Sequence, residues 1–98
     1  MRPSTTLSRY SLPYFWDDEA WEDYRYWQTQ DARTLKKIND LLRDIARSGG
    51  KGIGQAELLK GNRRGLSSAR IDGKNRLVYK VEGDIVRVVS CRGHYDDK

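Results

Sequence analysis

The sequence contains little cysteine, histidine or proline, and each scarcity excludes a class of site. Its 98 residues include one cysteine, two prolines and a single histidine, His94. With Cys91 alone the chain cannot form an internal disulfide, which is typical of proteins from reducing compartments. One histidine and one cysteine without paired ligand spacing do not make a zinc site. We therefore expect neither a metal nor another cofactor.

Long apolar runs are also missing. No stretch is long enough for a membrane span or a signal peptide, so we expect a cytoplasmic location and no membrane partner. The sequence also lacks a nucleophile elbow and the glycine-lysine pattern of a P-loop. These absences argue against a serine hydrolase and a P-loop nucleotide-binding protein. A DNA-binding regulator is a weak hypothesis, because no helix-turn-helix signature is present.

Basic charge is abundant and unevenly distributed. Nineteen Lys and Arg against fourteen Asp and Glu give a formal net charge of +5. Between residues 51 and 80 only Glu57 and Asp72 are acidic, against eight basic residues: Lys51, Lys60, Arg63, Arg64, Arg70, Lys74, Arg76 and Lys80. Acidic residues gather instead at positions 17–23. The second half of the chain is therefore the better candidate for binding an anion.

The N-terminal half predicts an extension, a strand and a helix. We expect residues 1–13 to be a flexible extension, with a basic arm that contacts nucleic acid as the alternative, and residues 14–98 to form one domain. Residues 14–16 are a short strand. Asp17 or Asp18 is the expected N-cap of a helix. Trp21, Tyr24 and Gln28 lie on one side of this helix, with Ala20 and Trp27 beside them. This aromatic stripe favours packing on a sheet over stacking on bases.

A second helix is predicted to begin after Asp31, its expected N-cap, and to end before Gly49 and Gly50. Apolar residues recur at helical spacing: Leu35, Ile38, Leu41, Leu42 and Ile45. The opposite face is basic, which indicates either a solvated surface or a contact with phosphate.

Strands follow this helix. We expect a short edge strand at 57–60 and longer strands at 66–71, at 76–82 and from 85 toward Gly93, with turns at 72–75 and 83–84. Isoleucine and valine at four positions of the last strand predict that both of its faces are at least partly covered. Gly93 breaks this strand, so His94 and Tyr95 should lie at the rim of the sheet. The residues thus predict a small basic domain of helices and strands.

The candidate chemistry is acid–base cleavage of RNA, in which the ribose 2′-hydroxyl is the nucleophile. Such a reaction needs a base, an acid and cations beside the phosphate. Glu57 is a candidate base and His94 a candidate acid, and the candidate cations are Arg70, Arg76 and Lys60. A lone histidine is more often a structural or surface residue. The residues alone therefore leave RNA binding and RNA cleavage both open.

Several short motifs occur together in one order. They are Ala20-Trp21-Glu22-Asp23-Tyr24, Trp27, Lys36-Lys37-Ile38-Asn39, Glu57-Leu58-Leu59-Lys60, Arg76-Leu77-Val78-Tyr79 and Cys91-Arg92-Gly93-His94-Tyr95. This set resembles the Txe/YoeB toxins of the RelE superfamily, over residues 14–95. The resemblance implies an α+β single domain, with a mostly antiparallel sheet of about five strands and two N-terminal helices packed on one side.

The same resemblance implies a function. Toxins of this family belong to bacterial type II toxin–antitoxin systems and cleave mRNA in the A site of the 70S ribosome without a metal. The expected partners are a YefM-type antitoxin, the ribosome with its mRNA, and a second copy of the chain. Operator DNA is expected to be bound only through the antitoxin complex.

Site residues carry over from the family motifs. The resemblance implies that Glu57 is the base and His94 the acid, and that Tyr95 orients the substrate or the histidine. Arg76 and Arg70 are assigned to the phosphate, with Lys60 as a further RNA contact.

The chain departs from the family pattern before Ile71. An aromatic-Ser-Arg-Arg run is usual there, and this chain has Leu66-Ser67-Ser68-Ala69-Arg70. One arginine and the aromatic residue are missing, so Arg63 and Arg64 are candidate replacements in RNA binding. Leu58 replaces a usual proline, and residues 96–98 extend past the usual C-terminal tyrosine. The departures keep a non-catalytic RNA- or ribosome-binding module as an alternative.

The even numbering of three site residues gives a structural requirement. Arg70, Arg76 and His94 all have even numbers, and side chains alternate between the faces of a strand. For all three to point into one site, each hairpin needs an odd-numbered connection or a β-bulge.

Overall fold

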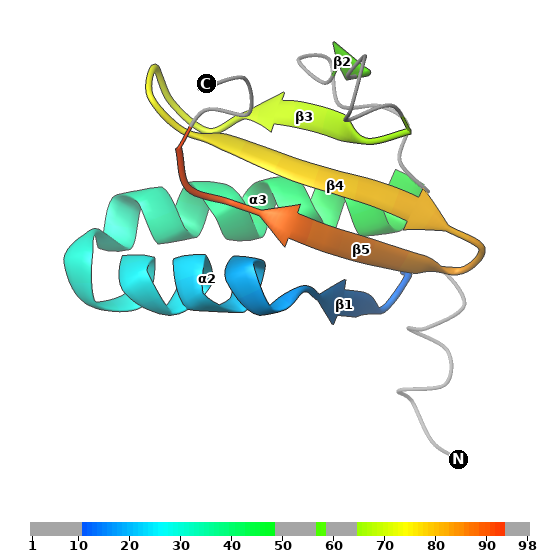
Figure 1. Ribbon diagram of the computed structural model, residues 1–98, viewed down its shortest axis with the longest axis horizontal. Coiled ribbons are helices and arrows are strands. Elements are labelled where there is room, and N and C mark those ends of the chain that lie inside the picture. The colour runs from blue at the N-terminus through cyan, green and yellow to red at the C-terminus, as the bar shows by residue number, and fades with distance from the viewer. Residues whose placement is uncertain (1–10, 49–56, 59–64, 94–98) are drawn as a thin grey trace.

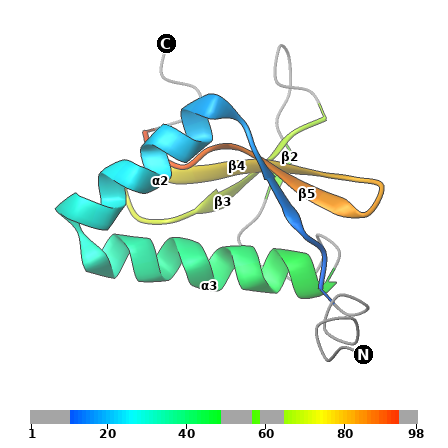
Figure 2. The same cartoon turned by 90° about the horizontal axis from the view of Figure 1, so that it is seen from below.

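The computed structural model describes residues 11–48, 57–58 and 65–93, and for residues 57 and 58 only the backbone. Its elements are β1 (Tyr14–Trp16), α2 (Asp18–Gln30), α3 (Ala32–Ser48), β2 (Glu57–Leu58), β3 (Ser67–Arg70), β4 (Arg76–Glu82) and β5 (Ile85–Ser90). The five strands form one sheet in the order β1-β5-β4-β3-β2. Figures 1 and 2 show both helices packed on one face of this sheet. The predicted α+β fold is confirmed.

The sheet is antiparallel except at one edge. β5 pairs with β4, β4 with β3 and β3 with β2 in antiparallel ladders. β1 runs parallel to β5, with Tyr14 opposite Val86. The predicted edge strand at 57–60 is confirmed for residues 57 and 58 at the other edge of the sheet, and residues 59 and 60 lie outside the described chain.

The folded domain begins before the expected residue 14. The Leu12 amide donates a hydrogen bond to the Ala46 carbonyl of α3 (3.1 Å), and the Pro13 carbonyl accepts one from the Val86 amide of β5 (2.9 Å). The Leu12 side chain also packs against the core. The expected extension of residues 1–13 is therefore too long at its C-terminal end, and residues 1–10 lie outside the described chain.

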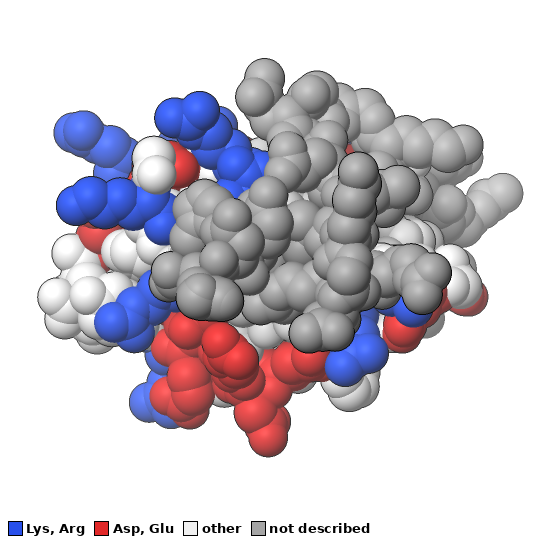
Figure 3. Space-filling view, turned by 45° about the horizontal axis from the view of Figure 1, so that its top comes forward, with Lys and Arg blue, Asp and Glu red and all other residues white. Residues whose placement is uncertain are grey.

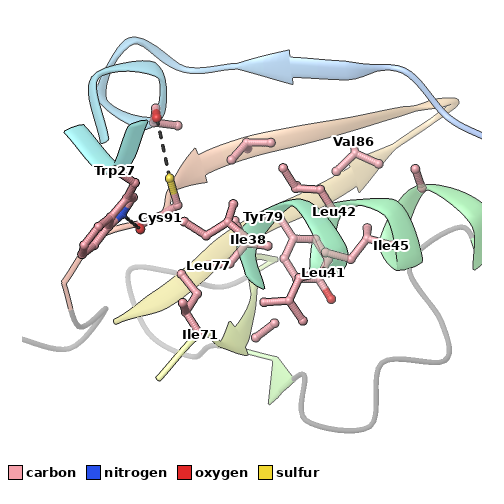
Figure 4. Packing of buried hydrophobic residues seen from close by; sticks show 14 residues of the cluster. Trp27, Ile38, Leu41, Leu42, Ile45, Ile71, Leu77, Tyr79, Val86 and Cys91 are labelled. Atoms are coloured by element: carbon pink, nitrogen blue, oxygen red, sulfur yellow. Dashed lines mark hydrogen bonds between the residues drawn. The ribbon is translucent and has the colours of Figure 1, made fainter. Parts of the chain in front are cut away.

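The core lies between the helices and the sheet. Among the buried residues of α3 are Ile38, Leu41, Leu42 and Ile45, and the facing strands contribute Leu77, Tyr79, Val86 and Val88. Figure 4 shows the α3 side chains directed toward the strands. This confirms the apolar stripe predicted for α3, of which Leu35 is only partly buried. Burying such side chains is the main favourable contribution to the stability of a domain of this size.

The two helices are capped differently. The Asp31 carboxylate accepts hydrogen bonds from the Arg33 and Thr34 amides (3.1 and 3.2 Å), as expected for the N-cap of α3. Asp17 occupies the N-cap position of α2, but its side chain makes no cap hydrogen bond. The Asp17 carboxylate instead accepts two hydrogen bonds from Arg87 (2.9 and 3.1 Å). The predicted position of this cap is right and its predicted interaction is wrong.

The register of the sheet meets the requirement set by the even-numbered residues. Arg70 lies directly opposite Arg76, with residues 71–75 between them, so the first connection has an odd length. Between β4 and β5 the register shifts at Val78/Tyr79: Val78 pairs with Ser90 and Tyr79 with Val88. Past this β-bulge, Ser90 of β5 lies opposite Val78 of β4, whereas the even-numbered Val86 and Val88 before it lie in the core.

Candidate active site

The candidate active site lies on the sheet face opposite the helices, which we call the far face. It carries Ser68 and Arg70 from β3 and Arg76 and Val78 from β4, because these residues form opposing pairs in the β3–β4 register. Leu77 and Tyr79 alternate with them and point into the helix-covered core. Arg70 and Arg76 are thus neighbours on one face, as predicted.

The Arg76 side chain is held against β3. Its Nε donates a hydrogen bond to the Ser68 hydroxyl (2.6 Å), and Nη2 donates one to the Ser68 carbonyl (3.4 Å). Ser68 is fully buried, Arg76 is half-buried and Arg70 is exposed. A guanidinium fixed in this way is oriented before a ligand arrives, which favours bidentate recognition of phosphate.

Two arginines directly opposite each other are unfavourable for the sheet itself. Like charges at a cross-strand pair repel and destabilise the pairing. An anion bound by Arg70 and Arg76 would relieve this repulsion. An anion is therefore a suitable ligand for this pair.

The backbone of Glu57 lies beside this pair. Glu57 is opposite Ser68 in the β2–β3 ladder, and Ser68 is also the residue that holds the Arg76 side chain. The side chain of Glu57 lies outside the described part of the structure.

Gly93, which follows β5, contacts the backbone of Arg76 and the side chain of Asn75. Its carbonyl accepts a hydrogen bond from the Arg76 amide (2.9 Å), and its amide donates one to Asn75 Oδ1 (2.8 Å). Gly93 has a φ of 86°, a conformation that costs glycine little and other residues more. The residue that directly precedes His94 is therefore fixed at the start of β4.

The remaining predicted site residues cannot be placed. His94, Tyr95, Lys60, Arg63 and Arg64 lie outside the described residues. The structure brings together Arg70, Arg76 and the backbones of Glu57 and Gly93.

Sequence reasoning missed four residues that support the site. They are Ser68 beside Arg76, Asn75 beside Gly93, and Asp23 and Trp27 of α2 beside Cys91. Asn75 lies in a turn that was predicted, but its partner is 18 positions away. Asp23 and Trp27 contact a residue more than 60 positions away. No local sequence pattern predicts contacts between residues so far apart in the chain.

Electrostatics divide the described surface. Acidic side chains cluster on α2. Figure 3 shows acidic side chains gathered along the lower part of its view and most Lys and Arg side chains at its left. On the far face, Lys80 pairs with Glu82 (3.4 Å), and Arg87 pairs with Asp17 (2.9 Å). Charges at this end of the sheet thus have partners within the chain.

Two further features of the described residues bear on chemistry. No group of three or more His, Cys, Asp or Glu side chains among them is placed to hold a metal ion. Burial raises the pKa of the Cys91 thiol to about 12, and the nearby Asp23 carboxylate adds to the effect. This thiol is therefore protonated and unreactive at neutral pH.

No helix in the described part of the chain is long and apolar enough to cross a membrane.

Comparisons with known proteins agree on one family. The sequence model described as a YoeB-like toxin of a bacterial type II toxin–antitoxin system matches residues 16–95. Toxin YoeB of Escherichia coli strain K12 is 46% identical over 84 residues, which cover 86% of this chain and 100% of that toxin.

Two solved structures from Staphylococcus aureus are similar in fold and sequence. The toxin chain of a heterotetrameric YoeB–YefM complex has a TM-score of 0.78 and 44% identity, covering 86% of this chain and 98% of its own. A YoeB dimer has a TM-score of 0.79 and 43% identity, covering 87% and 99%. With this agreement in sequence, fold and coverage, the chain belongs to the YoeB-like toxins of bacterial type II toxin–antitoxin systems.

Proposed function

We propose that this toxin is an endoribonuclease that cuts mRNA in the ribosomal A site and so inhibits translation. The observation that carries the proposal is a chain of three contacts, two between backbones and one between side chains. Glu57 pairs with Ser68, Ser68 holds Arg76, and Arg76 binds the carbonyl of Gly93. The backbones of Glu57, Arg76 and Gly93, which directly precedes His94, are thus close together, and we assign the base, the cation and the acid to Glu57, Arg76 and His94.

In the proposed reaction Glu57 removes the proton from the ribose 2′-hydroxyl. The 2′-oxygen attacks the phosphorus atom and the bond from phosphorus to the 5′-oxygen breaks. His94 gives its proton to the departing 5′-oxygen. The products are a 2′,3′-cyclic phosphate and a 5′-hydroxyl.

Arg70 and Arg76 neutralise the charge that develops on the phosphate oxygens. Arg76 is pre-oriented by Ser68, so little reorganisation is needed as that charge grows. Lys60, Arg63 and Arg64 add contacts to the RNA backbone, and Tyr95 orients the substrate or the histidine. The reaction needs no metal, because side chains supply the base, the acid and the cations beside the phosphate.

The ribosome supplies the arrangement of the RNA. In-line attack needs the 2′-oxygen, phosphorus and 5′-oxygen aligned, and positioning of this kind accounts for a large part of enzymatic rate enhancement. We therefore expect ribosome-bound mRNA to be cut much faster than free RNA.

The alternative of a non-catalytic RNA- or ribosome-binding module rested partly on the arginine missing at position 69. Ala69 is fully buried in the core and lies opposite Leu77. The substitution therefore removes no cation from the face that carries Arg70 and Arg76, which favours the enzyme over the alternative.

The partners follow from the S. aureus relatives. Since those toxins occur as a YoeB–YefM complex and as a dimer, we infer that this toxin binds a YefM-type antitoxin and forms a homodimer in the bacterial cytoplasm. It binds operator DNA only through the antitoxin complex.

The test is primer extension on a defined mRNA in 70S ribosomes, with toxin pretreated with EDTA. We expect a discrete A-site cut with wild type and losses of at least about 100-fold with Glu57→Ala, His94→Ala and Arg76→Ala. The matched control is Asp44→Ala, which removes an exposed carboxylate of α3 and should cut at the wild-type rate. Intact ribosome binding without any cut would identify a binding module instead, and equal cutting by all variants would refute the assigned roles.

A further inference from the structure

Cys91, which directly follows β5, is held by side chains of α2. β5 ends at Ser90, yet both backbone polar groups of Cys91 are bonded. The Cys91 amide donates to Asp23 Oδ2 (3.1 Å), and its carbonyl accepts from the Trp27 indole Nε1 (2.9 Å). Both partners belong to α2, and all of these groups are buried. Two side chains of a helix thus replace the strand that would otherwise pair here.

The Asp23 carboxylate is costly to bury. Burial raises its pKa, while the hydrogen bond from the Cys91 amide opposes that rise. Its side chain is 8% exposed, and acidic side chains are seldom buried to this extent without a partner. The gain that offsets this cost is a fixed backbone at Cys91.

Arg92 adds a third contact with the same helix. Its guanidinium carbon lies 3.6 Å from the centroid of the Tyr26 ring, within the range of a cation–π interaction. Arg92 is exposed, so this contact contributes less than the two buried hydrogen bonds.

Asn75 completes the set from the β3–β4 turn. Its Oδ1 accepts from the Gly93 amide, while its Nδ2 donates to both oxygens of Asp72 (3.1 and 3.2 Å). Asp72 also accepts from the Lys74 and Asn75 amides (both 2.8 Å). Although its partial burial acts the other way, these hydrogen bonds together lower the pKa of Asp72, so it stays ionised at neutral pH. The hydrogen bonds to Asp72 therefore fix the orientation of the Asn75 side-chain amide.

We propose that Asp23, Trp27 and Asn75 are positioning residues for His94. They fix the backbones of Cys91 and Gly93, and Gly93 directly precedes His94, so they determine where the chain delivers its catalytic acid relative to Arg76. This inference rests on the proposed function of His94. Displacements of about 1 Å in a catalytic group can lower a rate by about 100-fold. The cleavage rate should therefore be sensitive to the loss of these contacts.

The kinetic test uses single-turnover cleavage of mRNA in 70S ribosomes, with the maximal rate measured separately from the half-saturating ribosome concentration. Asn75→Ala and Asp23→Ala should lower the maximal rate by about 10- to 100-fold and change half-saturation by less than about 3-fold. Asp23→Asn keeps an acceptor for the Cys91 amide and should restore most of the lost rate.

The matched control is Tyr24→Phe. It removes a comparable hydrogen bond, from the Tyr24 hydroxyl to Asn39 Oδ1 (2.8 Å), away from Cys91 and Gly93. Losses in Asn75→Ala and Asp23→Ala no greater than in this control, or losses confined to half-saturation, would overturn the inference.

A second readout does not depend on cleavage. His94 is the only histidine, so its ring protons give one titration curve in an NMR spectrum. Asn75→Ala and Asp23→Ala should shift this curve, because moving the imidazole changes its distance from nearby charges, whereas Asp23→Asn and Tyr24→Phe should leave it near wild type. An unchanged curve in the two alanine variants overturns the inference. Absence of cleavage by wild type would count against the proposed function alone.

Discussion

At the scale of the residue, one small side chain fixes the position of the Arg76 guanidinium. Ser68 is a small buried residue, yet it connects β2, β3 and the Arg76 guanidinium through its ladder position and its hydroxyl. Arg70 and Arg76 lie directly opposite each other, and an anion bound between them would reduce their mutual repulsion. The opposite end of the far face pairs Lys80 and Arg87 with acidic residues, so the two ends of one sheet face serve different purposes.

Cys91 gives a prediction at this scale. With a pKa of about 12, only about one thiol in 10,000 is ionised at pH 8, and the side chain is 0% exposed. Iodoacetamide at pH 8 should leave the folded protein unmodified and should label Cys91 in guanidinium chloride. Lys36→Cys is the matched control, since that position is 77% exposed and should be labelled in the folded state. Labelling of Cys91 at the rate of this control would mean that the thiol is accessible.

At the scale of the element, local patterns predicted the helices and strands well. The spacing of Ile38, Leu41 and Ile45 fixes the buried side of α3, and Asp31 fixes its start. The strand at 76–82 has the predicted bounds. Propensity and period suffice for such elements, because each carries its own signal.

The face of α2 was not predictable in the same way. Of the expected contacts, Ala20 and Trp27 are buried and Tyr24 packs against the core, but Trp21 is 44% exposed. The buried Asp23 was not expected. The aromatic residues also pack on one another, with Trp16 and Tyr24 centroids 4.8 Å apart. A carboxylate looks like a surface residue in a sequence, and only the distant Cys91 amide makes its burial favourable. The same holds for Asp17, whose partner Arg87 is 70 positions away.

The N-cap of α3 gives a prediction for this element. Hydrogen bonds from the Thr34 amide and hydroxyl, followed by that from the Arg33 amide, lower the pKa of Asp31. Asp31→Ala should therefore lower the melting temperature at neutral pH, and Asp31→Asn should lower it less. Because the folded-state pKa is the lower one, the capping contribution is present above the ordinary pKa of aspartate and is lost as the pH falls through the folded value.

The measurement is thermal unfolding from pH 7 down to pH 3. The gap between wild type and Asp31→Ala should narrow below about pH 4. Asp44→Ala, a change of an exposed acid far from the N-terminus of the same helix, should show no such gap. A gap of constant size across this range would show that the ionised carboxylate is not what stabilises the cap.

At the scale of the whole molecule, the sequence predicts the architecture and the distribution of charge. It does not predict the strand register that brings the site residues onto one face. The β-bulge between β4 and β5 and the odd connection between β3 and β4 were requirements of the site, not features with a signal of their own. The parallel pairing of β1 with β5 joins the two ends of the chain. Pairings between distant segments depend on the complete fold, so no local period reports them.

The charge division gives the last prediction. Under the proposed function, acidic residues at the start of α2, including Glu19 and Glu22, should oppose the approach of RNA, and the basic residues of the far face should attract it. The double variant Glu19→Gln/Glu22→Gln should lower the half-saturating ribosome concentration by about 2- to 5-fold in low salt and leave the maximal cleavage rate unchanged. The difference should disappear near 0.5 M monovalent salt, where screening acts within about 4–5 Å. Lys36→Gln/Lys37→Gln, which removes two exposed charges of opposite sign from α3, is the matched control. If the α2 variant binds no more tightly than wild type in low salt, acidic repulsion has no part in how the toxin approaches the ribosome.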